Sequence, residues 1–221
     1  VTDPRNPRVK ETNGEANANI TSNLGQVIEF VAVGPDNYLE PIRGPQTFVA
    51  NQNLKGSLFE DSSGAFQDID YLIIAPPFMM QPALRLAGHR AQRNGLRVKV
   101  VSTDRIYEEF KSGSQDIGAI RNLVKYVYDN ASSSANRIKY LCLFGDASVD
   151  YKDRLSGNNN IVPTYHNYNS FSTLNGFMSD DYFGLMDPEE GRLNPSDLLD
   201  IAVGRIVADD ISLANAMVDK L

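Results

Sequence analysis

Four short runs of strand-forming residues, separated by segments with helical spacing, constrain the fold of this chain more than any other feature. They cover residues 71–75, 96–101, 140–144 and 200–205. The first and third are continuously apolar and end at Pro or Gly, as strands buried on both faces of a sheet do. Strands that alternate with helices are joined by right-handed crossovers, which make them parallel. The sequence therefore predicts an α/β fold, with a parallel sheet flanked by helices.

The segments between these runs carry helix signals. Apolar residues recur every three or four positions over 82–94, and Asn94-Gly95 is a typical helix end. Thr103-Asp104 can cap a helix over 106–110, and Asp116 can cap another over 117–128. A last helix is predicted to begin near Ser212 and to run to the end of the chain. Each predicted strand thus has a helical neighbour that can cover one face of the sheet.

The first part of the chain has a different pattern and predicts a separate region. Residues 26–33 and 47–50 are short, apolar and partly β-branched, which favours strands, and no helical spacing is present before residue 59. We therefore expect residues 1–65 to be the end of a β-rich region and residues 66–221 to form the α/β region. Because the chain begins with Val1 rather than Met, we also expect it to be a segment of a longer protein.

Composition excludes several classes of function. The net charge is -7 and no Lys/Arg cluster is present, which argues against a nucleic-acid partner. The single cysteine rules out an intramolecular disulfide, and no apolar run approaches the length of a membrane span. A flavodoxin-like nucleotide or flavin binder is disfavoured, because the glycines form no phosphate-binding motif.

Neither the cysteine nor the two histidines predicts a catalytic or zinc site. Cys142 lies between Leu141 and Leu143 in an apolar run, where a buried structural role is expected for a thiol. His89 lies in the first predicted helix and His166 in a polar loop, with no partners at zinc-ligand spacing. We therefore assign no catalytic residue within this chain.

Carboxylates near two strand ends favour a calcium site. Asp146 follows the strand at 140–144, and an acidic stretch that includes Asp187 and Asp197 leads to Asp200, at the start of the next strand. Calcium binds six to eight oxygen ligands, many of them from loops. We expect Asp146 and Asp200 to converge at one sheet edge, with Asp187 and Asp197 as looser candidates. The alternatives are an Asx turn at Asp146, a solvated acidic loop, or neutralisation of these acids by Arg154 or Arg205.

From about residue 70 onward, a series of short motifs occurs in a characteristic order. The motifs are Tyr71-Leu72-Ile73-Ile74, His89-Arg90, Gly95-Leu96, Ile106-Tyr107-Glu108-Glu109-Phe110, Ser112-Gly113, Gln115-Asp116, Ala119-Ile120-Arg121, Leu143-Phe144-Gly145-Asp146, Val162-Pro163-Thr164-Tyr165, Ser179-Asp180-Asp181-Tyr182-Phe183-Gly184 and Val203-Gly204-Arg205. In this order and spacing the chain resembles the gingipain family of cysteine peptidases, and within it the members that serve the type IX secretion system as signal peptidase and sortase.

The resemblance implies a caspase-like fold, a Cys–His dyad, and cleavage of C-terminal sorting signals from secreted proteins. It also implies an extracytoplasmic place at the outer membrane or cell surface, with cargo and other secretion-system proteins as partners. Calcium binding by family members points to Asp146 and Asp200 best, and to Asp187 and Asp197 less closely. The family's histidine lies in a Gly-His-Gly motif that is absent here, so we expect the dyad beyond Leu221 and no activity from this segment. The alternative is a non-catalytic α/β scaffold or binding module of the secretion or cell-surface apparatus.

Overall fold

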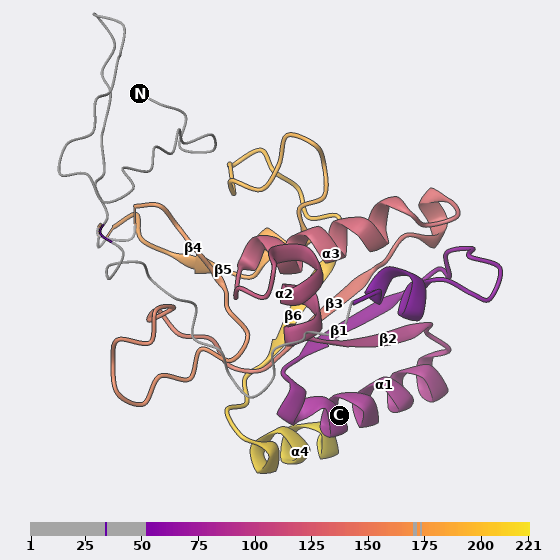
Figure 1. Ribbon diagram of the computed structural model, residues 1–221, viewed down its shortest axis with the longest axis horizontal. Coiled ribbons are helices and arrows are strands. Elements are labelled where there is room, and N and C mark those ends of the chain that lie inside the picture. The colour runs from indigo at the N-terminus through magenta and orange to yellow at the C-terminus, as the bar shows by residue number, and fades with distance from the viewer. Residues whose placement is uncertain (1–33, 35–51, 170–171, 173) are drawn as a thin grey trace, which may run out of the picture. The chain divides into compact units, whose positions relative to one another are not determined.

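The computed structural model describes residues 34, 52–169, 172 and 174–221, and all structural statements concern these residues. Apart from residue 34, they belong to one unit that covers residues 50–221 (Figure 1). The strands predicted at 26–33 and 47–50 lie outside the described residues. The proposed division into residues 1–65 and 66–221 stays a prediction.

The centre of the unit is a parallel sheet of four strands in the order β2-β1-β3-β6. A short antiparallel hairpin is formed by β4 and β5. In chain order the strands and α-helices are β1 (Tyr71–Ala75), α1 (Met80–Asn94), β2 (Val98–Ser102), α2 (Thr103–Lys111), α3 (Ile117–Asp129), β3 (Tyr140–Phe144), β4 (Tyr165–His166), β5 (Met178–Ser179), β6 (Ala202–Ile206) and α4 (Ile211–Asp219).

Helices cover both faces of the sheet, as Figure 1 shows. Alternate residues of β1 and β3 point to opposite faces, which gives the unit two separate cores. Leu72 and Leu143 pack with the apolar residues of α2 and α3. Ile73 and Phe144 pack with those of α1 and α4 on the other face. The predicted α/β architecture with a parallel sheet is therefore confirmed, and it follows from strands that are apolar on both faces.

Local capping explains where two of the helices begin. The Asp116 carboxylate accepts a hydrogen bond from Gly118 N at 2.6 Å, which confirms the predicted cap of α3. Asp210 caps α4 in the same way, accepting from Leu213 N at 2.7 Å. None of the described helices is long and apolar enough to cross a membrane.

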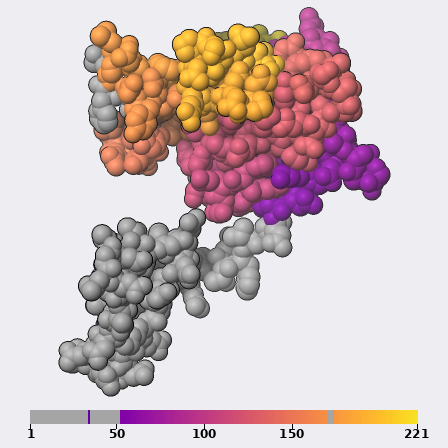
Figure 2. Space-filling model, turned by 90° about the horizontal axis from the view of Figure 1, so that it is seen from above, coloured from indigo at the N-terminus to yellow at the C-terminus, as the bar shows by residue number. Residues whose placement is uncertain are grey.

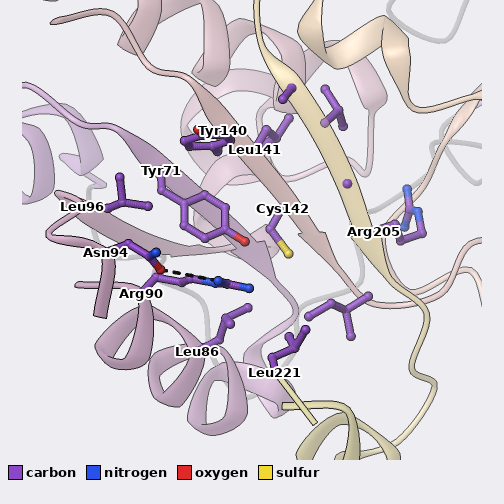
Figure 3. A pocket seen from close by; sticks show the side chains of 14 residues that line it. Tyr71, Leu86, Arg90, Asn94, Leu96, Tyr140, Leu141, Cys142, Arg205 and Leu221 are labelled. Atoms are coloured by element: carbon purple, nitrogen blue, oxygen red, sulfur yellow. Dashed lines mark hydrogen bonds between the residues drawn. The ribbon is translucent and has the colours of Figure 1, made fainter. Parts of the chain in front are cut away.

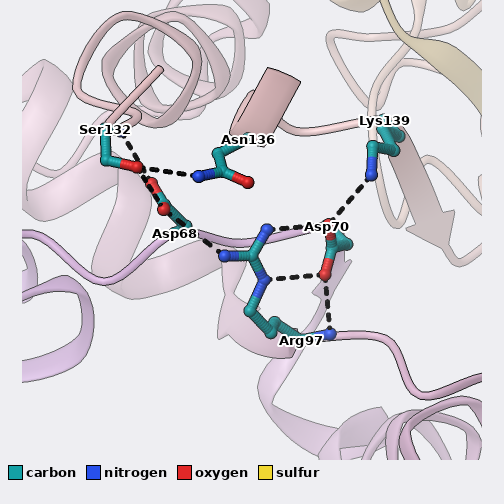
Figure 4. A network of polar contacts seen from close by, with 6 residues as sticks. All are labelled: Asp68, Asp70, Arg97, Ser132, Asn136 and Lys139. Atoms are coloured by element: carbon teal, nitrogen blue, oxygen red, sulfur yellow. Dashed lines mark hydrogen bonds and ion pairs between the residues drawn. The ribbon is translucent and has the colours of Figure 1, made fainter. Parts of the chain in front are cut away.

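The amino-terminal edge of the sheet is held by a polar network centred on Asp70 (Figure 4). The Asp70 carboxylate accepts three hydrogen bonds from Arg97, at 2.8–3.0 Å, and a fourth from Lys139 Nζ at 3.3 Å. Asp70 is 7% exposed, and the contact with Arg97 holds the pKa of its carboxyl well below the usual range. Since Asp70 precedes β1, Arg97 precedes β2 and Lys139 precedes β3, this network aligns three strands.

The residues just before β1 also belong to this core. Leu54 and Phe59 are fully buried, and Phe59 packs near Phe66 and Tyr126 of α3, with ring centroids 6.2 and 6.1 Å away. Sequence patterns did not indicate this packing, because the turn of π-helix at Lys55–Phe59 is too short to show a period.

Candidate functional site at the carboxyl edge of the sheet

The order of the strands places a topological switch point between β1 and β3, at their carboxyl ends. The chain passes from β1 to β2 through α1 on one face, and from β2 to β3 through α2 and α3 on the other. Helices therefore diverge between β1 and β3, the position at which α/β sheets bind their ligands. The loop after β3 and the hairpin β4–β5 lie at this edge, and the loop after β6 reaches it.

The turn after β3 requires a glycine and is fixed by backbone contacts. Gly145 has φ 148°, and a Cβ there would lie 2.8 Å from Ile161 Cγ2. The backbone N–H groups of Gly145 and Asp146 donate to the carbonyls of Ile206 and Ala208, both at 2.9 Å. This turn therefore continues the pairing of β3 with β6 beyond the strands.

A nearly buried ion pair fastens the hairpin region to the sheet. Arg205 of β6 has 10% of its side chain exposed and bonds both oxygens of Asp180, at 2.7 and 2.8 Å. Its guanidinium also donates to the carbonyls of Gly145 and Val162, at 2.8 and 2.7 Å. Thr164, which is 7% exposed, donates its hydroxyl to Asp180 at 2.7 Å. We call this group, Arg205 with Asp180 and Thr164, the Arg205 clamp.

Aromatic side chains gather on the hairpin that the clamp holds. Tyr165 of β4 stacks on Tyr182 with ring centroids 5.0 Å apart, and Phe177 lies 6.4 Å from Tyr165. Tyr168, two residues after β4, is 96% exposed. In the space-filling view the hairpin segment, in orange, lies at one end of this unit beside the acidic loop, in yellow (Figure 2).

The acidic loop between Leu185 and Asp200 is attached to α3 rather than folded around an ion site. Arg121 of α3 donates to the carbonyls of Leu185 and Glu190, at 2.6 and 3.2 Å. Asp187 N–H donates to Glu190 at 3.0 Å, and Asp197 accepts from Asn194 N at 3.0 Å. These contacts are local turns within the loop, in which the carboxylates of Glu190 and Asp197 accept hydrogen bonds from backbone N–H groups.

The structure does not bring the four predicted calcium ligands together. Asp146 follows the carboxyl end of β3, whereas Asp200 precedes the amino end of β6, and the two strands are parallel with Tyr140 opposite Ala202. The four residue steps of the paired strands alone span about 13 Å at about 3.3 Å per residue, so these two carboxylates lie at opposite edges of the sheet. Asp146 accepts from Ala147 N and Asn159 Nδ2, while Asp200 accepts from Tyr128 Oη and Met186 N.

The expected convergence of Asp146 and Asp200 is therefore wrong, because it ignored strand direction. The four carboxylates do not fit one calcium ion, and across the residues that the structure describes no three His, Cys, Asp or Glu side chains form a metal-binding group. The alternative expectation was that an arginine neutralises these carboxylates. Arg205 does pair with a carboxylate, but with that of Asp180 rather than with one of the four candidates. A basic residue inside an otherwise apolar strand was the signal for this pair.

The only cysteine is placed as expected, in the interior of the sheet. Cys142 lies in β3 and is 5% exposed, and burial raises the pKa of its thiol to about 11. Among the described residues no hydrogen bond joins it to a histidine: His89 lies in α1, and His166 of β4 packs against Tyr151 with ring centroids 5.7 Å apart. Cys142 is therefore a protonated core thiol at neutral pH and not a nucleophile.

Comparison with known proteins places this architecture in one class of enzyme. The sequence pattern of peptidase family C25 matches residues 64–221, which is most of the chain and includes every strand described above. The chain belongs to this family, the gingipain family of cysteine peptidases.

Within the family, the chain is similar to latent, dimeric PorU from Porphyromonas gingivalis. The identity is 29% and the TM-score 0.61, over 78% of this chain and 16% of the PorU chain. It also matches the complex of RgpB pro- and mature domains from the same organism, at 18% identity and a TM-score of 0.43, over 68% of this chain and 28% of that one. No curated protein gives a significant match. The chain thus spans about a sixth of the length of PorU.

Proposed function

We propose that this chain is the first part of the catalytic domain of a cysteine endopeptidase and sortase that removes C-terminal sorting signals from proteins of a type IX secretion system. The observation that carries the proposal is the similarity to PorU, at 29% identity over 78% of this chain. The catalytic cysteine and histidine come from residues outside these 221, since Cys142 is buried with a raised thiol pKa and has no histidine partner among the described residues.

In this proposal the chain supplies the scaffold of the active site rather than its nucleophile. A cysteine peptidase needs a thiolate beside a base, held against an extended peptide. The carboxyl edge of the sheet is the surface on which such groups can be arranged, and the Arg205 clamp fastens the hairpin to it. The exposed aromatic hairpin, with Tyr168 and Phe177, is the part of this edge that a polypeptide substrate can contact.

Place and partners follow from the same similarity. We propose that the protein works outside the cytoplasm, at the outer membrane or cell surface. Its partners are cargo proteins that carry C-terminal signals and other components of the secretion system. The alternative is a non-catalytic scaffold module of the same apparatus, which would keep the clamp and the sheet but lack the dyad in the rest of its sequence.

The full natural reading frame and one assay distinguish the two. We expect a Gly-His-Gly motif and an exposed cysteine after the next strand, and thiol-dependent cleavage of a peptide that spans a C-terminal sorting signal. Replacing that later cysteine with Ser should abolish cleavage, whereas Cys142→Ser should leave it unchanged. Folded full-length protein with no thiol-dependent cleavage would favour the scaffold. Cleavage lost in a folded Cys142→Ser variant would overturn our assignment of this residue.

A further inference from the structure

The hairpin β4–β5 lies within the longest uncharged stretch of the sequence. Residues 155–179 contain no Asp, Glu, Lys or Arg, although 22% of the chain is charged. Fourteen of these 25 residues are Tyr, Ser, Gly or Asn. Charged side chains are normally concentrated on the surface of a protein. This composition therefore differs from that of an ordinary solvated loop.

The large side chains of the hairpin are exposed rather than packed. Tyr168 and Leu174 are 96% and 93% exposed, and Phe177 and Met178 are 46% and 49% exposed. We call these four residues the hairpin surface. Exposed apolar side chains that gather in one place mark interaction sites. Tyr together with Ser, Gly and Asn is also the composition of antibody loops, in which aromatic rings give contact area at low entropic cost and small polar residues give adaptable hydrogen bonds.

Contacts within the chain fasten the base of the hairpin. Thr164 and Asp180, which flank the two strands, belong to the Arg205 clamp, and Figure 3 shows Arg205 on β6. Tyr165 of β4 stacks on Tyr182 with ring centroids 5.0 Å apart. A surface that is already held in place loses little conformational freedom when it binds a partner. The hairpin is thus mounted as a recognition element.

One edge of the hairpin offers unpaired backbone groups. Asn167 N–H donates to Phe177 O at 3.0 Å, and His166 is the neighbouring residue opposite Met178. Hydrogen-bonded and non-hydrogen-bonded pairs alternate in an antiparallel ladder, so the N–H and C=O groups of His166 and Met178 face away from the partner strand. Among the described residues, no backbone hydrogen bond from outside the hairpin reaches either of them. His166 packs against Tyr151, whereas Met178 is half exposed, so the edge of β5 is the open one.

We propose that the hairpin surface and the edge of β5 dock an extended, uncharged segment of a polypeptide, which adds to β5 as a further strand. An unpaired strand edge binds extended peptides through main-chain hydrogen bonds, and neighbouring side chains give the specificity. The missing charge defines the partner, because a charged segment would lose hydration against a stretch that offers no counter-charge. Neutral apolar and hydroxyl side chains complement Tyr168, Leu174 and Phe177. The inference deepens the proposed function and rests on it in taking the polypeptide to be cargo.

Binding of a cargo protein, with its C-terminal sorting signal, to the 221-residue chain tests the surface by biolayer interferometry. Leu174→Ser and Leu84→Ser make the same change at two exposed leucines, since Leu84 of α1 is 56% exposed. We expect Leu174→Ser and Tyr168→Ser each to weaken binding by about fivefold, and Leu84→Ser to leave it unchanged. The affinity should change little between about 0.05 and 0.5 M NaCl, because the surface is uncharged. The melting midpoint of every variant verifies that it is folded.

A second pair of variants tests the addition of a strand. Met178→Pro removes the outward N–H, which an edge strand tolerates, whereas Met178→Ala keeps it. Met178→Pro should therefore weaken binding more than Met178→Ala. Equal effects of these two variants, equal effects of Leu174→Ser and Leu84→Ser, or a steep loss of affinity with salt would overturn the proposal. Self-association of the chain that Leu174→Ser abolishes would assign the surface to a second copy instead.

Kinetics of the full natural protein separate this inference from the proposed function. Tyr168→Ser should raise the KM for cargo by about fivefold and leave kcat unchanged, as the loss of uniform binding does. Binding through the hairpin without any cleavage by the full protein would contradict the proposed function and leave the docking surface standing. Normal cleavage, with neither KM nor binding altered by Tyr168→Ser, would overturn the docking surface alone.

Discussion

Replacing Arg205 tests whether the clamp holds the carboxyl edge together. In Arg205→Met the side chain keeps most of its volume but loses four hydrogen bonds, two to Asp180 and one each to the carbonyls of Gly145 and Val162. It also leaves Asp180, of which 24% of the side chain is exposed, without its counter-charge. The substitution therefore removes one cation and deprives three acceptor groups of the hydrogen bonds that Arg205 donates.

The expected loss is large because the pair is mostly removed from water. Breaking a buried ion pair from one side costs about 3–5 kcal/mol. We expect the lower half of this range, because Asp180 keeps partial contact with solvent. For a unit of this size each kcal/mol lowers the melting midpoint by about 2–4 °C, so that the full range corresponds to roughly 6–20 °C. Urea unfolding followed by circular dichroism measures the free energy directly.

Matched variants separate the clamp from a general effect of charge. Asp129→Asn removes an acid from the exposed Lys125–Asp129 pair, whose atoms lie 2.6 Å apart, and should cost less than about 1 kcal/mol. Asp180→Asn should cost more than Asp129→Asn in the wild type. In the Arg205→Met background it should cost about 1–3 kcal/mol less than in the wild type, because the two residues act together. If Arg205→Met costs no more than Asp129→Asn, the reasoning about the clamp is refuted.

Three further predictions follow from individual groups. Because the pKa of Asp70 is lowered in the folded state, its carboxylate contributes to the free energy of unfolding at pH values above its ordinary pKa, near 4, and this contribution is lost as the pH falls. The difference in urea stability between wild type and Asp70→Asn should therefore shrink between about pH 5 and pH 2. A constant difference would contradict the role of Arg97. With a pKa of about 11, the thiol of Cys142 is only about one-thousandth thiolate at pH 8. Thiol reagents should therefore react with the folded chain far more slowly than with the urea-unfolded chain. Equal rates would contradict the burial of Cys142. Calcium binding stays a prediction. Because the register places Asp146 and Asp200 at opposite edges of the sheet, at most one of Asp146→Asn and Asp200→Asn should abolish a calcium-dependent rise in melting midpoint. Loss of the rise in both variants would contradict that register.

The fold could be predicted from the sequence because the local signals agree with one another. The four strands stand within two residues of the apolar runs that indicated them, and Asp116 caps α3 as its position implied. Neither signal needs information about distant contacts. The packing of Leu54 and Phe59 could not be predicted, because it depends on Phe66 and Tyr126, which belong to other elements and share no period with them.

The site was predicted less well, because a site depends on which strand ends meet. One residue can follow a strand directly while another directly precedes the parallel strand beside it. Both then flank neighbouring strands, yet they lie at opposite edges of the sheet. Asp146 and Asp200 are such a pair. The residues that do meet at the carboxyl edge are those after β3 and those late in β6, which is why Arg205 reaches both Gly145 and Asp180.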